Sequence, residues 1–200
     1  LVDSTTSTTW QEPIVLCSDS VHYQVSIADN SGCESRSTLD GDLFVDNTIP
    51  DAPDVRCIAI DPTGEVTLTW IPPVDTGLSF NSYHIFYSTS AGGPYNEVDS
   101  IFNYNATSYV HTGINANNTN VYYYVETRTN CGVQYSAPSD TLHGIKLNVT
   151  AIANKTVAQL QWNEVHSPLL PSSDLYYKIY KEYPAGLWSF LDSTLSLIHI

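Results

Sequence analysis

VYYYVETRTNCG, at Val121–Gly132, has a near copy one hundred positions earlier, VHYQVSIADNSGC at Val21–Cys33. Both stretches alternate apolar and polar residues and then pass through a polar turn to a cysteine. Alternation with a period of two is typical of a β-strand with one buried face. Recurrence at a fixed interval indicates one structural unit used more than once. The sequence therefore predicts repeated β-modules of roughly 100 residues, near the commonest domain size.

A second repeated pattern ends a strand with tryptophan. EVTLTW ends at Trp70, and VAQLQW repeats it with Trp162. Each is followed by a Tyr-x-Ile strand, SYHIFYS at 82–88 and YYKIYKEY at 176–183. Between residues 49 and 145 we expect about seven short strands separated by turns, as in a β-sandwich.

These repeats divide the chain. Residues 1–48 hold the Tyr-x-Val strand and the hairpin after it, so we interpret them as the C-terminal part of one module. Residues 49–145 form a complete module, and residues 146–194 begin a third. Residues 195–200, LSLIHI, match what a common sequencing adapter encodes when read in frame, so we leave them out of the fold prediction.

Two linkers separate the predicted modules. DNTIPDAPDV, at Asp46–Val55, contains Pro50 and Pro53. Proline restricts φ and favours extended backbone, so this linker is expected to be semi-rigid. The second linker, near Gly144–Leu147, is shorter.

The composition limits the classes of partner. The 200 residues include 14 tyrosines and carry a formal net charge of −14 with only 7 Lys and Arg. Nucleic-acid affinity depends on cations that displace counterions, so a nucleic-acid partner is not expected. An anionic membrane surface is disfavoured by the same charge, and no apolar run reaches the ~20 residues needed to span a bilayer.

Together these residues resemble fibronectin type III domains. Prolines precede the first strand, Trp70 lies on the second, Tyr83-x-Ile85 on the third, and Tyr123-x-Val125 on the sixth. The resemblance implies an all-β chain of tandem immunoglobulin-like β-sandwiches, the first and last incomplete. It also implies core tryptophans at Trp70 and Trp162 and corner tyrosines at Tyr23 and Tyr123, although NANNTN replaces the usual residues upstream of Tyr123.

A narrower resemblance lies in ADNSGCESRSTLDGDLFVDNTIPDAP, at residues 28–53. This run looks like the repeat arrays of large surface proteins in gliding bacteria. Such arrays often end in a gliding-motility-associated sorting domain exported by the type IX system.

Four cysteines, Cys17, Cys33, Cys57 and Cys131, allow three complete pairings and indicate an oxidising compartment. The resembled fold places Cys57 and Cys131 at the same end of the sandwich, and we expect them to pair. An extended strand after Val21 would keep Cys17 and Cys33 roughly 20 Å apart or more, beyond disulfide reach. Either Cys17 folds back, or one of the two is unpaired or bonded elsewhere.

The first linker is acidic, and calcium prefers oxygen ligands. A possible calcium site there would use Asp40, Asp42, Asp46, Asp51 and Asp54. The run lacks the D-x-D-x-D-G spacing, so we favour a solvated junction without metal. No zinc pattern is present, and we expect no cofactor.

Phe86, Tyr122 and Tyr124 fall on the outward face of their strands and form a possible binding strip. Aromatic strips bind sugars or proteins, so a protein or glycan ligand is one interpretation. The alternative, which we favour, is that the three rings pack across strands against one another and the adjacent module.

No catalytic motif or phosphate-binding loop is present, so we do not expect an enzyme. We expect a non-enzymatic fragment of a secreted or cell-surface multidomain protein, in which tandem sandwiches serve as spacer or adhesion units. The alternative is a spacer or carbohydrate-binding accessory region of a secreted hydrolase.

Overall fold

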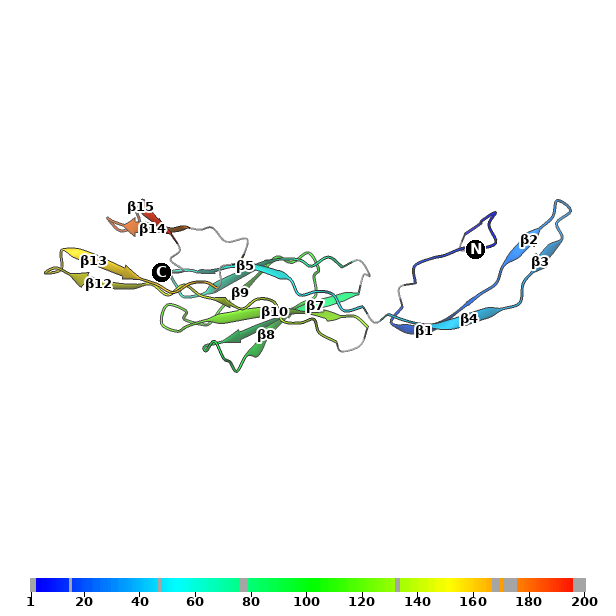
Figure 1. The fold of residues 1–200 in the computed structure, drawn as a ribbon, viewed down its shortest axis with the longest axis horizontal. Coiled ribbons are helices and arrows are strands. Elements are labelled where there is room, and N and C mark those ends of the chain that lie inside the picture. Colours follow the sequence, from blue (N-terminus) through cyan, green and yellow to red (C-terminus); the bar gives the residue numbers. More distant parts are fainter. Residues whose placement is uncertain are drawn as a thin grey trace.

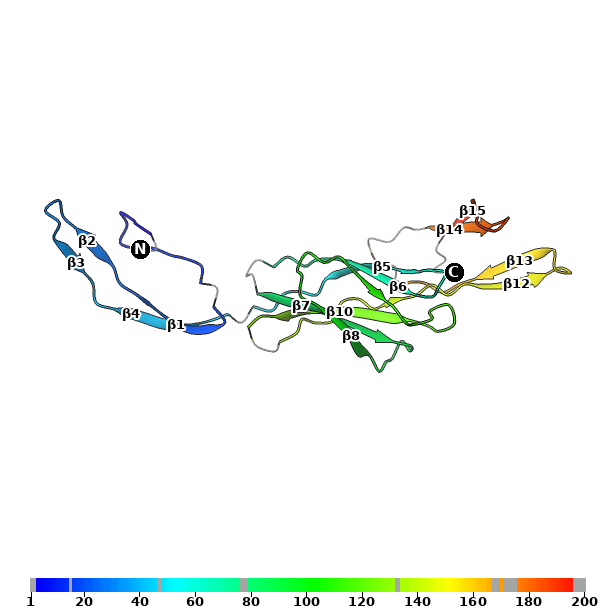
Figure 2. The same ribbon diagram turned by 180° about the vertical axis from the view of Figure 1, so that it is seen from behind.

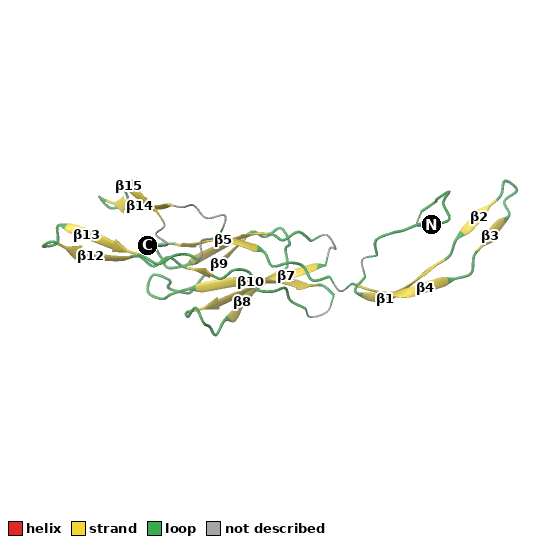
Figure 3. Cartoon of the chain, in the orientation of Figure 1, coloured by secondary structure: helices red, strands yellow, loops and turns green. Residues whose placement is uncertain are grey.

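The computed structural model of the chain describes residues 3–14, 16–46, 48–75, 79–131, 134–166, 170 and 176–195. Every regular element in this described part is a β-strand (Figure 3). The expected all-β class is therefore confirmed. Of the predicted adapter residues, 196–200 lie outside the described residues, and Leu195 ends the last strand.

The centre of the chain is a two-sheet sandwich (Figures 1 and 2). One sheet has the order β5-β6-β9 and the other β11-β10-β7-β8, and every pairing is antiparallel. The strands are β5 (Asp54–Ile60), β6 (Val66–Ile71), β7 (Phe80–Ser88), β8 (Asn96–Ile101), β9 (Ser108–His111), β10 (Tyr122–Thr129) and β11 (Leu142–His143).

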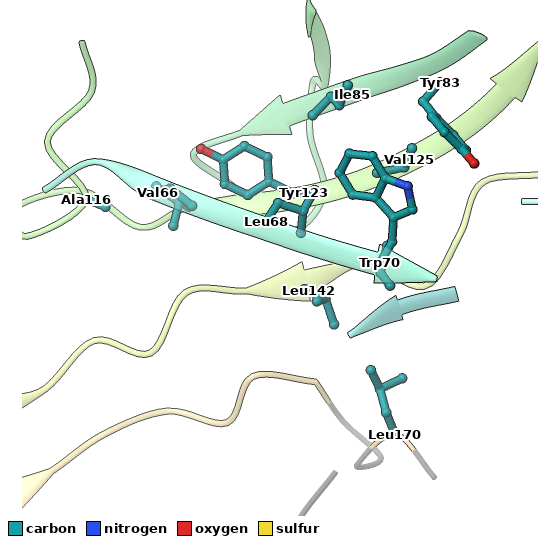
Figure 4. Packing of buried hydrophobic residues seen from close by; sticks show 12 residues of the cluster. Val66, Leu68, Trp70, Tyr83, Ile85, Ala116, Tyr123, Val125, Leu142 and Leu170 are labelled. Carbon is teal, nitrogen blue, oxygen red and sulfur yellow. The ribbon is translucent and has the colours of Figure 1, made fainter. Parts of the chain in front are cut away.

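The interior of this sandwich is built round Trp70. Its side chain is only 2% exposed, and its ring lies 5.3 Å from that of Tyr83. Figure 4 shows the indole between the two sheets, facing side chains from β7 and β10. The buried cluster comprises Val55, Val66, Leu68, Trp70, Tyr83, Ile85, Ala116, Val121, Tyr123, Val125, Leu142 and Leu170. The prediction that Trp70 is a core residue is confirmed.

Strand alternation sets which side chains enter this core. In the β10–β7 ladder Tyr123 lies opposite Tyr87, and Val125 lies opposite Ile85. Along β10 every second residue is buried, as the sequence pattern predicted. Within the described residues the Tyr123 hydroxyl bonds the His111 ring at Nδ1 (2.7 Å), where the resemblance implied a bond to the backbone.

The N-terminal region forms one long hairpin of β1 (Ser18–Tyr23), β2 (Ser26–Ala28), β3 (Glu34–Arg36) and β4 (Asp40–Val45). Two of its hydrogen bonds, between a valine and a serine, also occur in the central module. Val25 N donates to Ser37 Oγ (2.9 Å), and Ser37 N donates back to Val25 O (2.8 Å). Val125 and Ser139 make the same two bonds, at 2.9 and 3.0 Å. The two hairpins therefore share this valine–serine pairing.

This hairpin lies outside the central interior. Val25 and Ile27, the equivalents of Val125 and Thr127, are 72% and 74% exposed. In Figures 1 and 2 the hairpin extends away from the sandwich, beyond the N-terminal end of β5. None of the described residues among 1–48 thus belongs to the buried cluster round Trp70.

The C-terminal region contains two further hairpins, β12 (Asn148–Ile152) with β13 (Val157–Gln161), and β14 (Tyr176–Glu182) with β15 (Trp188–Leu195). Trp162 follows β13, is half-buried, and meets Tyr177 edge-to-face at 5.4 Å. This contact matches the Trp70–Tyr83 pair of the central module. Full burial of Trp162 was expected and is not observed. The module bounds themselves stay a prediction.

Candidate functional sites at the junctions and on the outer sheet face

A disulfide joins the N-terminal hairpin to the central sandwich. It links Cys17, just before β1, to Cys131, in the loop after β10, with the two Cα atoms 4.6 Å apart. The expected Cys57–Cys131 pairing is therefore wrong. Cys17 reaches Cys131 because β1 and β4 place it beside the linker, where Asp46 N donates to Cys17 O (3.2 Å).

Cys57 is an exposed free thiol on β5, and Cys131 is bonded to Cys17 instead. Cys57 lies opposite Thr69 of β6 and places its Sγ 2.9 Å from Thr69 Oγ1. Val55 is buried and Cys57 follows it by two positions, but a register shift between them turns Cys57 outward. Cys33, in the β2–β3 turn, is also an exposed thiol.

The first junction, defined as residues 46–53 with Cys17, Thr127 and Cys131, is also held by hydrogen bonding. The Thr127 hydroxyl is fully buried and lies 3.0 Å from Pro50 O and 2.9 Å from Asp51 O, so it shares its proton between two linker carbonyls. Pro50 and Pro53 are buried against the sandwich. The linker is thus anchored to the central module at its C-terminal half.

Replacing Thr127 with valine should destabilise this junction. Valine keeps the shape but leaves two carbonyls without their donor, which costs about 1–3 kcal/mol for a buried polar group. Denaturant unfolding of the full chain measures the loss. Thr67→Val, on the half-exposed face of β6, is the matched control and should change stability by less than about 0.5 kcal/mol. Equal effects of the two substitutions would contradict the anchoring role of Thr127.

The second junction, defined as residues 143–146 with Asn163 and Val165, depends on one amide side chain. Asn163 Nδ2 donates to Gly144 O (3.1 Å) and bonds His143 Nδ1 (3.0 Å), while Lys146 N donates to Asn163 Oδ1 (2.7 Å). His143 N donates to Val165 O (2.7 Å). A Cβ on Gly144 would lie 2.5 Å from Val121 Cγ2, so only glycine fits this approach. The linker into the third region is therefore fixed as well.

The structure does not gather the acidic residues of the first linker into a calcium site. Asp40 and Asp42 lie on β4 and accept bonds from the next backbone NH, and Asp46 accepts from Thr48 N. Asp54 pairs with Arg56 at 2.7 Å, and Asp51 is exposed. Within the described residues, no three His, Cys, Asp or Glu side chains are placed to hold a metal.

The aromatic strip lies on the outer face of the β11-β10-β7-β8 sheet. Phe86 and Tyr124 stack at 4.8 Å, and Tyr95 meets Tyr124 at 5.0 Å. Tyr122 stacks on His143 at 4.2 Å. All are half-buried, because each ring covers its neighbour across the strands. Ligand binding to the strip stays a prediction.

A polar cluster beside the strip was missed in the sequence. His84 Nε2 lies 2.9 Å from Ser82 Oγ, and His84 Nδ1 lies 2.6 Å from Glu97 Oε1. This order of groups is that of a hydrolytic triad. Ser82 has no exposed surface, however, and the Tyr135 ring meets His84 at 5.0 Å. A substrate cannot reach the hydroxyl, so the cluster acts as an internal hydrogen-bond network.

Burial of two histidines leads us to expect that the module is less stable in acid. Burial lowers the pKa of both His111 and His143. The unfolded chain then binds more protons than the native state just below the ordinary histidine pKa, so stability falls as the pH drops through that value. We expect the melting midpoint to fall by about 2–5 °C between about pH 7.5 and pH 5.5.

His111→Gln tests this expectation, because glutamine does not titrate and can still accept a bond from Tyr123. The variant should show a smaller change of midpoint over the same pH range. Burial raises the pKa of Glu126, which acts in the opposite direction at lower pH. An unchanged pH profile in the variant would exclude His111 as a source of the acid sensitivity.

No protein-family model matches the chain, and no curated protein matches it. Among solved structures, it is similar to an Fn3-like protein from Clostridium thermocellum at 26% identity and a TM-score of 0.38, over 48% of this chain and 92% of that one. A human FNIII domain matches at 23% identity and a TM-score of 0.37, over 48% and 76%. Domains of titin match at 20% identity and a TM-score of 0.39, over 52% of this chain and 35% of that one.

No helix in the described part of the chain is long and apolar enough to cross a membrane.

Proposed function

We propose that this chain serves as a semi-rigid spacer within a larger protein. The observation that carries the proposal is that both linkers are fixed to the same sandwich. The first is held by the Cys17–Cys131 bond and Thr127, and the second by Asn163. Adjacent domains move relative to each other unless their interface is large or otherwise restrained. A covalent bond and the hydrogen bonds of Thr127 and Asn163 supply that restraint here.

The setting that best fits this role is the cell surface. The disulfide requires an oxidising compartment, which supports an extracellular position. The net charge of −14 keeps an extended array soluble and disfavours contact with anionic surfaces. The likeness of residues 28–53 to repeat arrays of gliding bacteria supports an exported surface protein of that kind. A non-catalytic role agrees with the inaccessible Ser82 and with the half-buried aromatic strip.

Small-angle X-ray scattering of the dilute chain tests the spacer role. The oxidised protein should give the profile of one extended particle, and Cys17→Ser should broaden the distance distribution because the N-terminal hairpin gains freedom at the first junction. Cys57→Ser, which removes an exposed free thiol, should leave the profile unchanged. Identical profiles for oxidised protein and Cys17→Ser would refute a role for the disulfide in stiffening the array.

A further inference from the structure

The outer face of the β11-β10-β7-β8 sheet carries carboxylates as well as rings. Phe86 lies opposite Tyr124 in the β10–β7 ladder and opposite Glu97 in the β7–β8 ladder. Glu126 follows Tyr124 by two positions on β10, so its side chain leaves the same side of the strand. The two carboxylates therefore border the stacked Phe86–Tyr124 pair. We call the following six residues the acid–aromatic face: Phe86, Tyr95, Glu97, Tyr122, Tyr124 and Glu126.

One of the two carboxylates has no partner. Glu126 is half-buried, and among the described residues its side chain accepts no hydrogen bond and forms no ion pair. Arg128 lies two positions further along the same side of β10, but its guanidinium lies over the Tyr135 ring, 5.9 Å from the ring centre. A partly buried charge without a partner is unfavourable. A cationic ligand would supply the missing partner.

The second carboxylate adds to the negative potential at this place. The Glu97 side chain is 42% exposed, and its Oε1 lies 2.6 Å from His84 Nδ1. Burial raises the pKa of Glu126; His84 opposes this shift, and the charge of Glu97 adds to it. A cation bound beside Glu126 would favour its ionised form and so offset the effect of burial.

The stacking of the rings disfavours a sugar as the ligand. The ring planes of Phe86 and Tyr124 lie at 16° with centres 4.8 Å apart, and those of Tyr122 and His143 lie at 15° with centres 4.2 Å apart. Each stacked ring has one face covered by its neighbour, so less ring surface is open to a pyranose ring. The carboxylates beside the rings bind hydrogen-bond donors, and bind cationic donors best.

The charge of the chain favours a basic protein segment. The net charge is −14, with only 7 Lys and Arg, and a potential of this sign attracts cationic partners. Arginine fits this face better than lysine. Its planar guanidinium can form two parallel hydrogen bonds to one carboxylate, and it packs against aromatic rings.

We propose that the acid–aromatic face binds an arginine-bearing segment of a partner protein. Glu97 and Glu126 accept hydrogen bonds from guanidinium groups of the partner. The Phe86–Tyr124 pair supplies the apolar surface on which the arginine side chains pack. This binding role is separate from the spacer role, because it uses neither linker.

Titration with a dye-labelled tetra-arginine peptide tests the proposal. The unsubstituted protein should bind the peptide, and Glu97→Gln/Glu126→Gln should weaken binding by about tenfold or more, because charge-assisted hydrogen bonds become neutral ones. Asp19→Asn/Asp42→Asn removes the same charge from exposed positions of the N-terminal hairpin and should weaken binding by less than about twofold at physiological salt. No binding by the unsubstituted protein, or equal weakening by the two double variants, would overturn the proposal.

Nuclear magnetic resonance locates the bound peptide without any substitution. Adding tetra-arginine should shift the amide signals of β7, β8 and β10 most. Larger shifts in β1 and β4 would show unspecific attraction to the acidic hairpin and would count against the proposal. A glycan array covers the alternative ligand: a glycan that binds and is lost in Tyr124→Ala, with no binding of the peptide, would identify a sugar site instead. Any of these failures leaves the scattering test of the spacer role unaffected.

Discussion

The Trp70→Ala variant will lose about 3–5 kcal/mol of the free energy of unfolding, the usual cost of removing a buried aromatic side chain. Trp70 is 2% exposed and packs between the sheets against Tyr83. Truncation leaves a large cavity that the rigid sandwich fills only in part. Denaturant unfolding followed by circular dichroism measures this loss.

Trp188→Ala is the matched control. Trp188 lies on β15 and is 66% exposed, so its removal should cost less than about 1 kcal/mol. If Trp70→Ala and Trp188→Ala are equally mild, the central module does not depend on a buried indole, and the assignment of its core is wrong.

The Cys17→Ser variant should show the second large loss of stability. The disulfide spans 114 residues, and on the chain-entropy account a loop of this size contributes about 4–5 kcal/mol. Thermal unfolding of the oxidised protein and of Cys17→Ser gives the difference. Cys57→Ser should melt like the unsubstituted protein, because Cys57 is a free thiol.

Peptide mapping without reduction identifies the bonded cysteines directly. The expected product joins the peptides that contain Cys17 and Cys131. Recovery of a Cys57–Cys131 product, together with a stability loss in Cys57→Ser, would restore the pairing that the sequence alone had favoured.

The elements that sequence reasoning predicted correctly are those with local periodicity. Trp70, Tyr83 and Val125 alternate with polar residues, so their strand type and inward direction follow from the pattern. The repeat also predicted an N-terminal hairpin, which the structure contains and which shares its valine–serine bonds with the later one. An alternating pattern spans only a few residues, and it predicts the strand correctly wherever one face of that strand is buried.

The contacts at the junctions escaped prediction because they join distant residues. Cys17 meets Cys131 only through the path of β1 and β4 past the linker. No sequence pattern around Asn163 predicts the three hydrogen bonds that its side chain makes at the second junction. Thr127 did carry a signal: it places a hydroxyl at an inward position where the earlier repeat has Ile27, and a buried polar group needs a partner.

Distances alone would wrongly identify the triad-like cluster as a catalytic site. Ser82, His84 and Glu97 have suitable distances, yet the serine is fully buried. Function therefore depends on access as well as geometry, and access could not be judged from the short Ser-x-His spacing.

Native-state hydrogen exchange at increasing denaturant, with the disulfide intact, tests the modular account in one measurement. The account predicts that amides of β6, β7 and β10 open together with the highest free energy, and that amides of β1 and β4 exchange earlier as a separate unit. If β1 and β4 are protected to the same free energy and open together with β6, β7 and β10, the N-terminal hairpin shares the central core and the account is contradicted.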